Sequence, residues 1–165
     1  MALLQKAKWA RNFLLAVVVA VLAACEKNGL ELKKHEYKYL GLDSGRVITF
    51  NLAKKDVDNG HRIFAIELCD MPSFRLCLSG EITLAIPKGE LKAGNTWQLA
   101  GSKFSVASIE TNNKSTNYII VAESSAGEKM KIYFNEANGI WGLQLLEDGE
   151  MYKLVDSCGL GCSQK

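Results

Sequence analysis

Five cysteines give this chain its widest choice of chemistry, because a thiol can be acylated, oxidised to a disulfide, bound to a metal or used as a nucleophile. Cys25 is separate from the others. Cys69 and Cys77 are eight positions apart, and Cys158 and Cys162 are four positions apart. No Cys-x-x-Cys motif occurs and no histidine is nearby in sequence, so the spacing argues against a zinc site. We therefore expect no metal and no cofactor.

The stretch before Cys25 predicts export from the cytoplasm. Three basic residues and no acidic residue precede an uninterrupted apolar run, Phe13–Ala24. A positive segment, a short apolar run and small residues before a cut are the parts of a secretory signal. The run is much shorter than the roughly 20 apolar residues that a membrane-spanning helix needs. We expect residues 1–24 to be a helical signal peptide that is removed.

The last residues of that stretch, Leu22-Ala23-Ala24-Cys25, resemble the lipobox of bacterial lipoprotein precursors. The resemblance implies that the Cys25 thiol receives a diacylglyceryl group, that the leader is cut before it, and that the new amine is acylated with a fatty acid such as palmitate. Two or more chains of this kind anchor a protein stably to a membrane. Residues 25–36 are then the lipidated cysteine and a short tether. Glu26 is not the Asp that favours the inner membrane in enterobacterial sorting, so the outer membrane, facing the periplasm, is favoured.

Removal of the leader changes the charge of the chain. The full sequence has 20 basic and 18 acidic residues, and residues 1–24 contain three of the basic ones, which leaves 17 against 18. The processed chain therefore has a net charge of −1, and its longest basic runs are pairs of lysines. This pattern argues against a nucleic-acid partner. The length that remains is typical of one domain, which we place at residues 37–165.

The four remaining cysteines predict two disulfides, since an even number of thiols is typical of exported chains. A hairpin that turns near Met71–Ser73 would place Cys69 opposite Cys77. Cys158 and Cys162 would close a small loop that contains two glycines. We favour these two pairs, with cross-pairing as the alternative. The second loop would be either a clasp for the C-terminus or a rigid plug for the cleft of a partner.

Short segments rich in β-branched and aromatic residues recur along the chain, with turn signals such as Asn59-Gly60, Asn138-Gly139 and Asp148-Gly149 between them. Outside the leader no segment has a long helical period. We expect an all-β fold, a single antiparallel sandwich or barrel built from consecutive hairpins, with a bulge near Ala107 and a turn at 53–60. The expected strands are 37–40, 45–52, 61–69, 74–78, 81–86, 96–99, 103–110, 118–122, 129–134, 140–146 and 151–155.

Catalytic side chains are sparse in this sequence. Only His35 and His61 could serve as histidine bases, and no serine lies in a Gly-x-Ser-x-Gly nucleophile turn. Asp56 and Asp58 fall in an expected turn, where exposed carboxylates usually stay ionised. The segment Asp56–Gly60 has its glycine one position too early for a calcium loop. We expect the protein not to be an enzyme.

Two tryptophans are the best candidates for ligand contact. Trp97 and Trp141 stand beside small residues or glycines within expected strands, and Gly142 would let a ligand approach the backbone closely. The alternative is that both indoles fill the core. With Phe104, the two tryptophans would line a barrel cavity.

Two functions are compatible with these features. The first, which we favour, is a non-catalytic binding or interaction module held in the cell envelope by Cys25, with a protein partner such as an inhibited enzyme, a toxin or envelope machinery. The second is a carrier of a small hydrophobic ligand, with a barrel cavity around Trp97, Phe104 and Trp141. A cavity of ligand size, rather than a packed interior, distinguishes the carrier from the interaction module.

Overall fold

The structure is a computed structural model that describes residues 36–112 and 115–162 of the chain. The leader 1–24, Cys25 and the tether up to residue 35 lie outside the described residues. All the secondary-structure elements among the described residues are β-strands, which confirms the all-β prediction. None of the described residues belongs to a helix long and apolar enough to span a membrane. The strands are β1 (Glu36–Gly41), β2 (Val47–Asn51), β3 (Asp56–Asp58), β4 (Ile63–Leu68), β5 (Phe74–Gly80), β6 (Leu84–Pro87), β7 (Thr96–Leu99), β8 (Ser102–Asn112), β9 (Ser115–Glu123), β10 (Lys129–Asn135), β11 (Gly139–Leu145) and β12 (Met151–Leu154).

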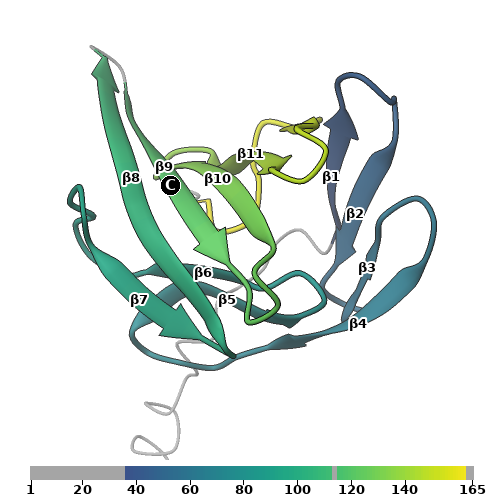
Figure 1. The fold of residues 1–165 in the computed structure, drawn as a ribbon, viewed down its shortest axis with the longest axis horizontal. Helices are drawn as coiled ribbons and strands as arrows, with labels where there is room; N and C mark the ends of the chain where they lie inside the picture. Colours follow the sequence, from purple (N-terminus) through teal and green to yellow (C-terminus); the bar gives the residue numbers. More distant parts are fainter. Residues whose placement is uncertain (1–35, 113–114, 163–165) are drawn as a thin grey trace, which may run out of the picture. The chain divides into compact units, whose positions relative to one another are not determined.

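The strands form one antiparallel sheet whose order follows the chain (Figure 1). Consecutive strands pair with each other, with one exception, and β1 also pairs with β12, with Tyr39 opposite Leu154. Among the described strands, only the consecutive pair β6 and β7 has no ladder between its members. The sheet is therefore a nearly closed barrel, one of the two architectures that the alternating pattern left open.

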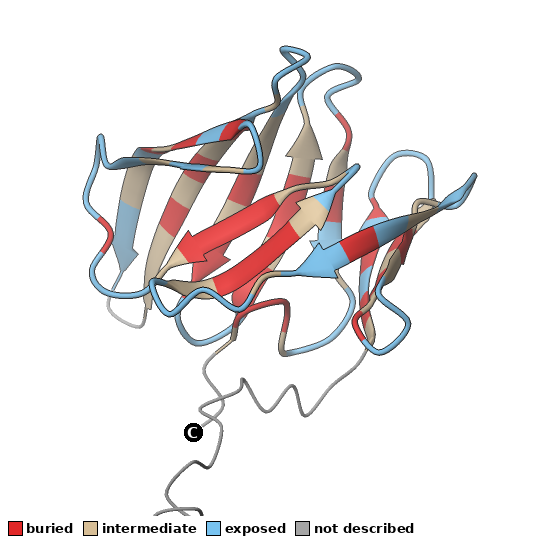
Figure 2. Cartoon of the chain, turned by 90° about the horizontal axis from the view of Figure 1, so that it is seen from below, coloured by how far each residue is buried: buried red, intermediate tan, exposed pale blue. Residues whose placement is uncertain are grey.

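Side chains alternate between the inside and the outside of this barrel, and Figure 2 shows the buried bands that result along the strands. In β1, Tyr37 and Tyr39 are buried whereas Lys38 and Leu40 are exposed. Burial of one large apolar side chain contributes about 1.5–3 kcal/mol to stability. The largest fully buried aromatic side chains are Tyr39, Tyr152, Phe50, Phe104 and Phe134. Most of the interior is thus a packed core.

A tryptophan bridges the gap between the two edge strands. The Trp97 indole on β7 donates a hydrogen bond from Nε1 to the Ala85 carbonyl oxygen on β6, at 3.2 Å. The same indole stacks on Phe104, with 5.7 Å between ring centroids and 3° between ring planes. Trp97 therefore belongs partly to the core, and its polar atom joins the two edges.

The C-terminal disulfide loop closes one end of the barrel. Cys158 pairs with Cys162, and Leu160 between them is fully buried. The Ile140 amide donates to the Leu160 carbonyl at 2.8 Å, so the loop is bound to the start of β11. Gly139 has a φ of 70°, and a Cβ atom there would lie 2.5 Å from backbone atoms of the loop. The loop is a clasp that fills its own barrel, and we call this end the clasp end.

The other disulfide lies where the sequence predicts it. Cys69 and Cys77 are paired with a Cα–Cα distance of 5.3 Å, and the Cys69 amide donates to the Cys77 carbonyl at 3.1 Å. The Phe74 amide donates to the Met71 carbonyl in the turn between them. Both favoured disulfide pairs are therefore confirmed, and cross-pairing does not occur.

One expected turn is partly a strand. Asp56–Asp58 forms β3, which pairs with β2 on one side and β4 on the other. Val57 at its centre is fully buried, and the turn that precedes it is made possible by Lys55 at a φ of 56°. Burial of one valine thus outweighs the polar composition of the segment. The bulge expected near Ala107 is present, as a register shift between Val106 and Ser108.

The Tyr39 hydroxyl links the core to the clasp, and its removal should destabilise the protein. It donates to the Ile140 carbonyl at 2.9 Å and accepts from the Leu160 amide at 3.3 Å, all in buried surroundings. Tyr39→Phe leaves both partners unpaired, so we expect a loss of about 1–3 kcal/mol in the free energy of unfolding. Urea denaturation measures this loss. The control is Tyr133→Phe, whose hydroxyl bonds only the Gln144 side chain. An equal effect of the two substitutions would contradict this role of Tyr39.

Candidate functional site

The end of the barrel opposite the clasp, which we call the open end, contains a cavity of about 320 Å³. Here β1 and β11 end and β2, β10 and β12 begin. Loops β5–β6, β7–β8, β9–β10 and β11–β12 supply the remaining walls. The cavity therefore draws its lining from most of the sheet. Its inward-facing strand residues are Ile48, Ser102, Ala122, Met130, Leu145 and Tyr152.

Small side chains at the open end create this space. Ser102 and Ala122 face inward on β8 and β9, and both are buried. Two residues deeper on the same faces are Phe104 and Ile120, which fill the core. Because the inward side chains change from large to small along both strands, the packed core stops below the rim and leaves the cavity above it.

The rim of the cavity is strongly charged. Four carboxylates and two cationic groups line it, and the cation Lys129 lies 3.6 Å from Glu123 in an ion pair. An apolar floor with a polar rim suits an amphipathic molecule, whose apolar part enters and whose polar part stays at the opening. The charged lining residues are Arg46, Lys129, Glu81, Glu128, Glu147 and Asp148.

A buried carboxylate, Glu150, organises one side of this rim. Its Oε1 accepts hydrogen bonds from the Ser44 amide at 2.9 Å and from the Ser44 hydroxyl. Its Oε2 accepts from the Arg46 guanidinium and from the Tyr152 hydroxyl at 2.9 Å. The opposing backbone is close enough that a Cβ at Gly41 would clash with Oε1. The network thus fixes the β1–β2 and β11–β12 loops to each other.

The hydrogen bonds set the charge states in the network. They lower the pKa of Glu150 to about 2, with the bond from the Ser44 hydroxyl as the largest cause, so the group is ionised at neutral pH. Burial and the neighbouring Glu150 raise the pKa of Tyr152 to about 12. Arg46 also lies 3.6 Å from Asp148 and 3.2 Å from the His61 ring. A carboxylate that accepts this many hydrogen bonds is a weak proton acceptor, so the arrangement favours binding over acid–base chemistry.

The two tryptophans singled out from the sequence lie apart. Trp97 packs on Phe104 inside the barrel, whereas Trp141 packs on Tyr133, 5.1 Å between ring centroids, in contact with the outer face. Neither indole lines the open-end cavity. Gly142 makes room for a neighbouring side chain, because a Cβ there would lie 2.5 Å from the Met151 methyl carbon. No single cavity therefore surrounds Trp97, Phe104 and Trp141 together.

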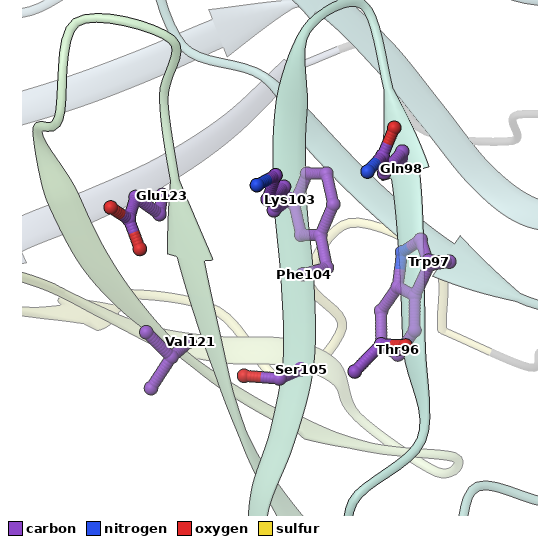
Figure 3. A pocket seen from close by; sticks show the side chains of 8 residues that line it. All are labelled: Thr96, Trp97, Gln98, Lys103, Phe104, Ser105, Val121 and Glu123. Carbon is purple, nitrogen blue, oxygen red and sulfur yellow. The ribbon is translucent and has the colours of Figure 1, made fainter.

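A second hollow, of about 550 Å³, lies over β7, β8 and β9 (Figure 3). Its side chains from alternate strand positions are polar apart from Val121, and Lys103 is directly opposite Glu123 in the register. The Trp97 N–H is already used by Ala85. Trp97 and Phe104 also line this hollow, where they stack on each other. Because its other side chains apart from Val121 are polar, we take the open-end cavity, which has a broader apolar floor, as the candidate site.

No metal site emerges from residues 36–112 and 115–162, where no three His, Cys, Asp or Glu side chains are grouped to hold an ion. Asp56 and Asp58 lie on β3, and the Asp58 carboxylate accepts from the Gly60 amide at 2.8 Å. That contact is typical of a turn.

The residues that line the cavity escaped the sequence analysis for a physical reason. Ser102, Ala122 and Met130 are ordinary strand residues, and only the register of the sheet brings them to one level. One partial signal was present: the small Ala122 ends the expected strand 118–122, beside strongly apolar residues, whereas Ser102 fell just outside the expected strand 103–110. Without the register of the strands, this signal does not show which side chains lie at the same level of the barrel.

No protein-family model, curated protein or solved structure matches this chain. A barrel-like fold alone does not specify a function, because related architectures have many roles. The cavity, its charges and its position relative to the start of β1 are the features of this molecule that bear on function.

Glu150→Gln should reduce the acid sensitivity of the protein. The lowered pKa means that ionised Glu150 stabilises the fold above the ordinary carboxyl pKa, and that this stabilisation is lost as the pH falls toward about 2. Between about pH 5 and pH 2 the wild type should lose stability more steeply than the variant. Urea midpoints across this range measure the slopes. Glu81→Gln, on the same rim, should keep the wild-type slope; identical slopes for all three proteins would refute the role of Glu150.

Proposed function

We propose that this protein is a lipid-anchored lipoprotein of the bacterial envelope that binds a small amphipathic molecule in its open-end cavity, without converting it. The cavity is the observation that carries the proposal. At about 320 Å³ it lies at the lower end of the roughly 300–1,000 Å³ typical of small-molecule sites. The lipobox supports the anchor, with lipidated Cys25 as the contact with the membrane.

The direction of β1 suits a tethered binding protein. β1 begins at Glu36 beside the clasp end and runs toward the open end, where Gly41 lies next to the Glu150 network. The tether therefore joins the barrel at the end away from the cavity. A protein anchored through that tether keeps its binding site free to meet ligands in the periplasm.

A protein partner is a second candidate, favoured by apolar side chains on the outer surface. Leu40 is 41% exposed, Ile63 68% and Val155 59%. Leu40 and Ile63 belong to the β1–β4 part of the sheet, and the Val155 amide bonds to the Lys38 carbonyl of β1. Such side chains suit the core of a transient interface.

Loss of a bound partner in affinity purification after Ile63→Asp, with the cavity unchanged, would support this second role.

The anchor is tested by Cys25→Ser. The serine hydroxyl cannot take the thioether-linked diacylglyceryl group, so labelling with a radioactive fatty acid should disappear and the domain should leave the membrane fraction. Cys69→Ser with Cys77→Ser is the control, because those thiols form a disulfide and should leave lipid labelling intact. Lipid labelling that persists in Cys25→Ser would refute the anchor.

The cavity is tested by native mass spectrometry of the protein purified from its own envelope. We expect a bound small molecule in the wild type, and roughly tenfold lower occupancy in Ala122→Phe, which fills the floor, and in Ser125→Trp, which covers the rim. Ser125 is exposed in the β9–β10 turn, so its substitution should not disturb folding. Ser105→Trp, in the outer hollow, is the matched control and should keep the ligand. Equal occupancy in all variants, or none in the wild type, would refute the cavity as the site.

A further inference from the structure

We infer that a polar groove around Trp141, on the outer face at the clasp end, binds an N-acetylated oligosaccharide. The groove has a volume of about 510 Å³ and is separate from the open-end cavity. It combines a partly exposed indole with amide and hydroxyl side chains from β9, β10 and the segment after β12. This inference does not depend on a ligand in the cavity.

The backbone places Trp141 on the outer surface. In the pairing of β10 with β11, Tyr133 is opposite Gly142 and Phe134 is opposite Ile140, so Trp141 is an extra residue in a bulge. A bulge of this kind re-aims a side chain and is frequent beside functional sites. The Tyr133 ring supports the indole, and the Tyr133 hydroxyl is itself bonded to Gln144 at 3.1 Å. The aromatic platform is therefore held in place before any ligand arrives.

Three asparagines surround this platform. Asn135 donates from Nδ2 to Asn117 Oδ1 at 3.1 Å and accepts from the Asn138 amide at 2.7 Å. The Asn138 carbonyl accepts from Gly159 at 2.8 Å, so the clasp holds the turn that carries Asn138. The Asn138 side chain is exposed and makes no hydrogen bond within the described residues. It offers a donor and an acceptor to a ligand from a rigid position.

The chemistry of the groove matches an N-acetylated sugar. A pyranose has an apolar C–H face that packs on an aromatic ring, while its hydroxyl and acetamido groups need both donors and acceptors. Lys153 and Asp156 in the lining have opposite charges, which favours a ligand without net charge. The Trp141 Nε1–H is buried and finds no acceptor among the described residues, so the indole carries a polar atom that the fold itself leaves unsatisfied.

The tryptophan content makes a direct experiment possible. Trp9 lies in the leader, so the processed chain has Trp97 and Trp141. In Trp97→Phe, Trp141 is the reporter of the groove; in Trp141→Ala, Trp97 reports on the opposite side of the sheet. The lipoprotein is purified in a zwitterionic detergent without a sugar headgroup and titrated with the tetramer of N-acetylglucosamine, while indole fluorescence is recorded.

We expect a saturable change of fluorescence in the wild type and in Trp97→Phe, and no saturable change in Trp141→Ala. Calorimetric titration of Asn138→Ala, an exposed substitution that should leave the urea midpoint unchanged, should show affinity roughly tenfold weaker than that of the wild type. No saturable change in Trp97→Phe, or wild-type affinity in Asn138→Ala, would overturn the inference. Saturable binding by Trp141→Ala would overturn it as well, because the sugar would then bind elsewhere.

Discussion

The pairing of β1 with β12 joins strands more than a hundred residues apart, and most features of the barrel depend on it. It brings the Glu150 carboxylate of one chain end to Ser44 and Arg46 near the other. It also places Tyr39 where its hydroxyl can bind the clasp. All other pairings link consecutive strands and can form locally as hairpins. Closure therefore has to wait for the C-terminal strand, and it converts a series of hairpins into one cooperative core.

Local signals specified most of the fold. The turns at Asn59-Gly60, Asn138-Gly139 and Asp148-Gly149 lie between the strands that alternation indicated, and the Cys69–Cys77 hairpin needs only its own residues. The strand β3 was missed, and the place of the clasp in the barrel could not be predicted, because both depend on distant contacts. β3 forms because Val57 is buried between β2 and β4, and the clasp has its position because Leu160 enters a space left by the whole sheet. Neither cause is visible in the neighbouring sequence.

The candidate site was harder to anticipate than the fold. Aromatic residues draw attention in a sequence, yet Trp97 joins two sheet edges and Gly142 accommodates Met151. The cavity instead results from small side chains, Ser102 and Ala122, at one level of the barrel. Hydrophobic alternation shows which residues face inward, but it contains no information about which of them share a level. That information is in the register, which the turns and the bulge near Ala107 set together.

The gap between β6 and β7 has a consequence for the behaviour of the protein in a crowded compartment. A sheet edge with free backbone groups is a template on which another chain can add a strand. Here the edge is blunted in two ways: the Ala85 carbonyl is occupied by the Trp97 indole, and Pro87 at the end of β6 has no N–H to offer. Both strands are also only four residues long. The barrel can thus lack a hydrogen-bonded ladder between β6 and β7 and still resist edge-to-edge aggregation with its own copies.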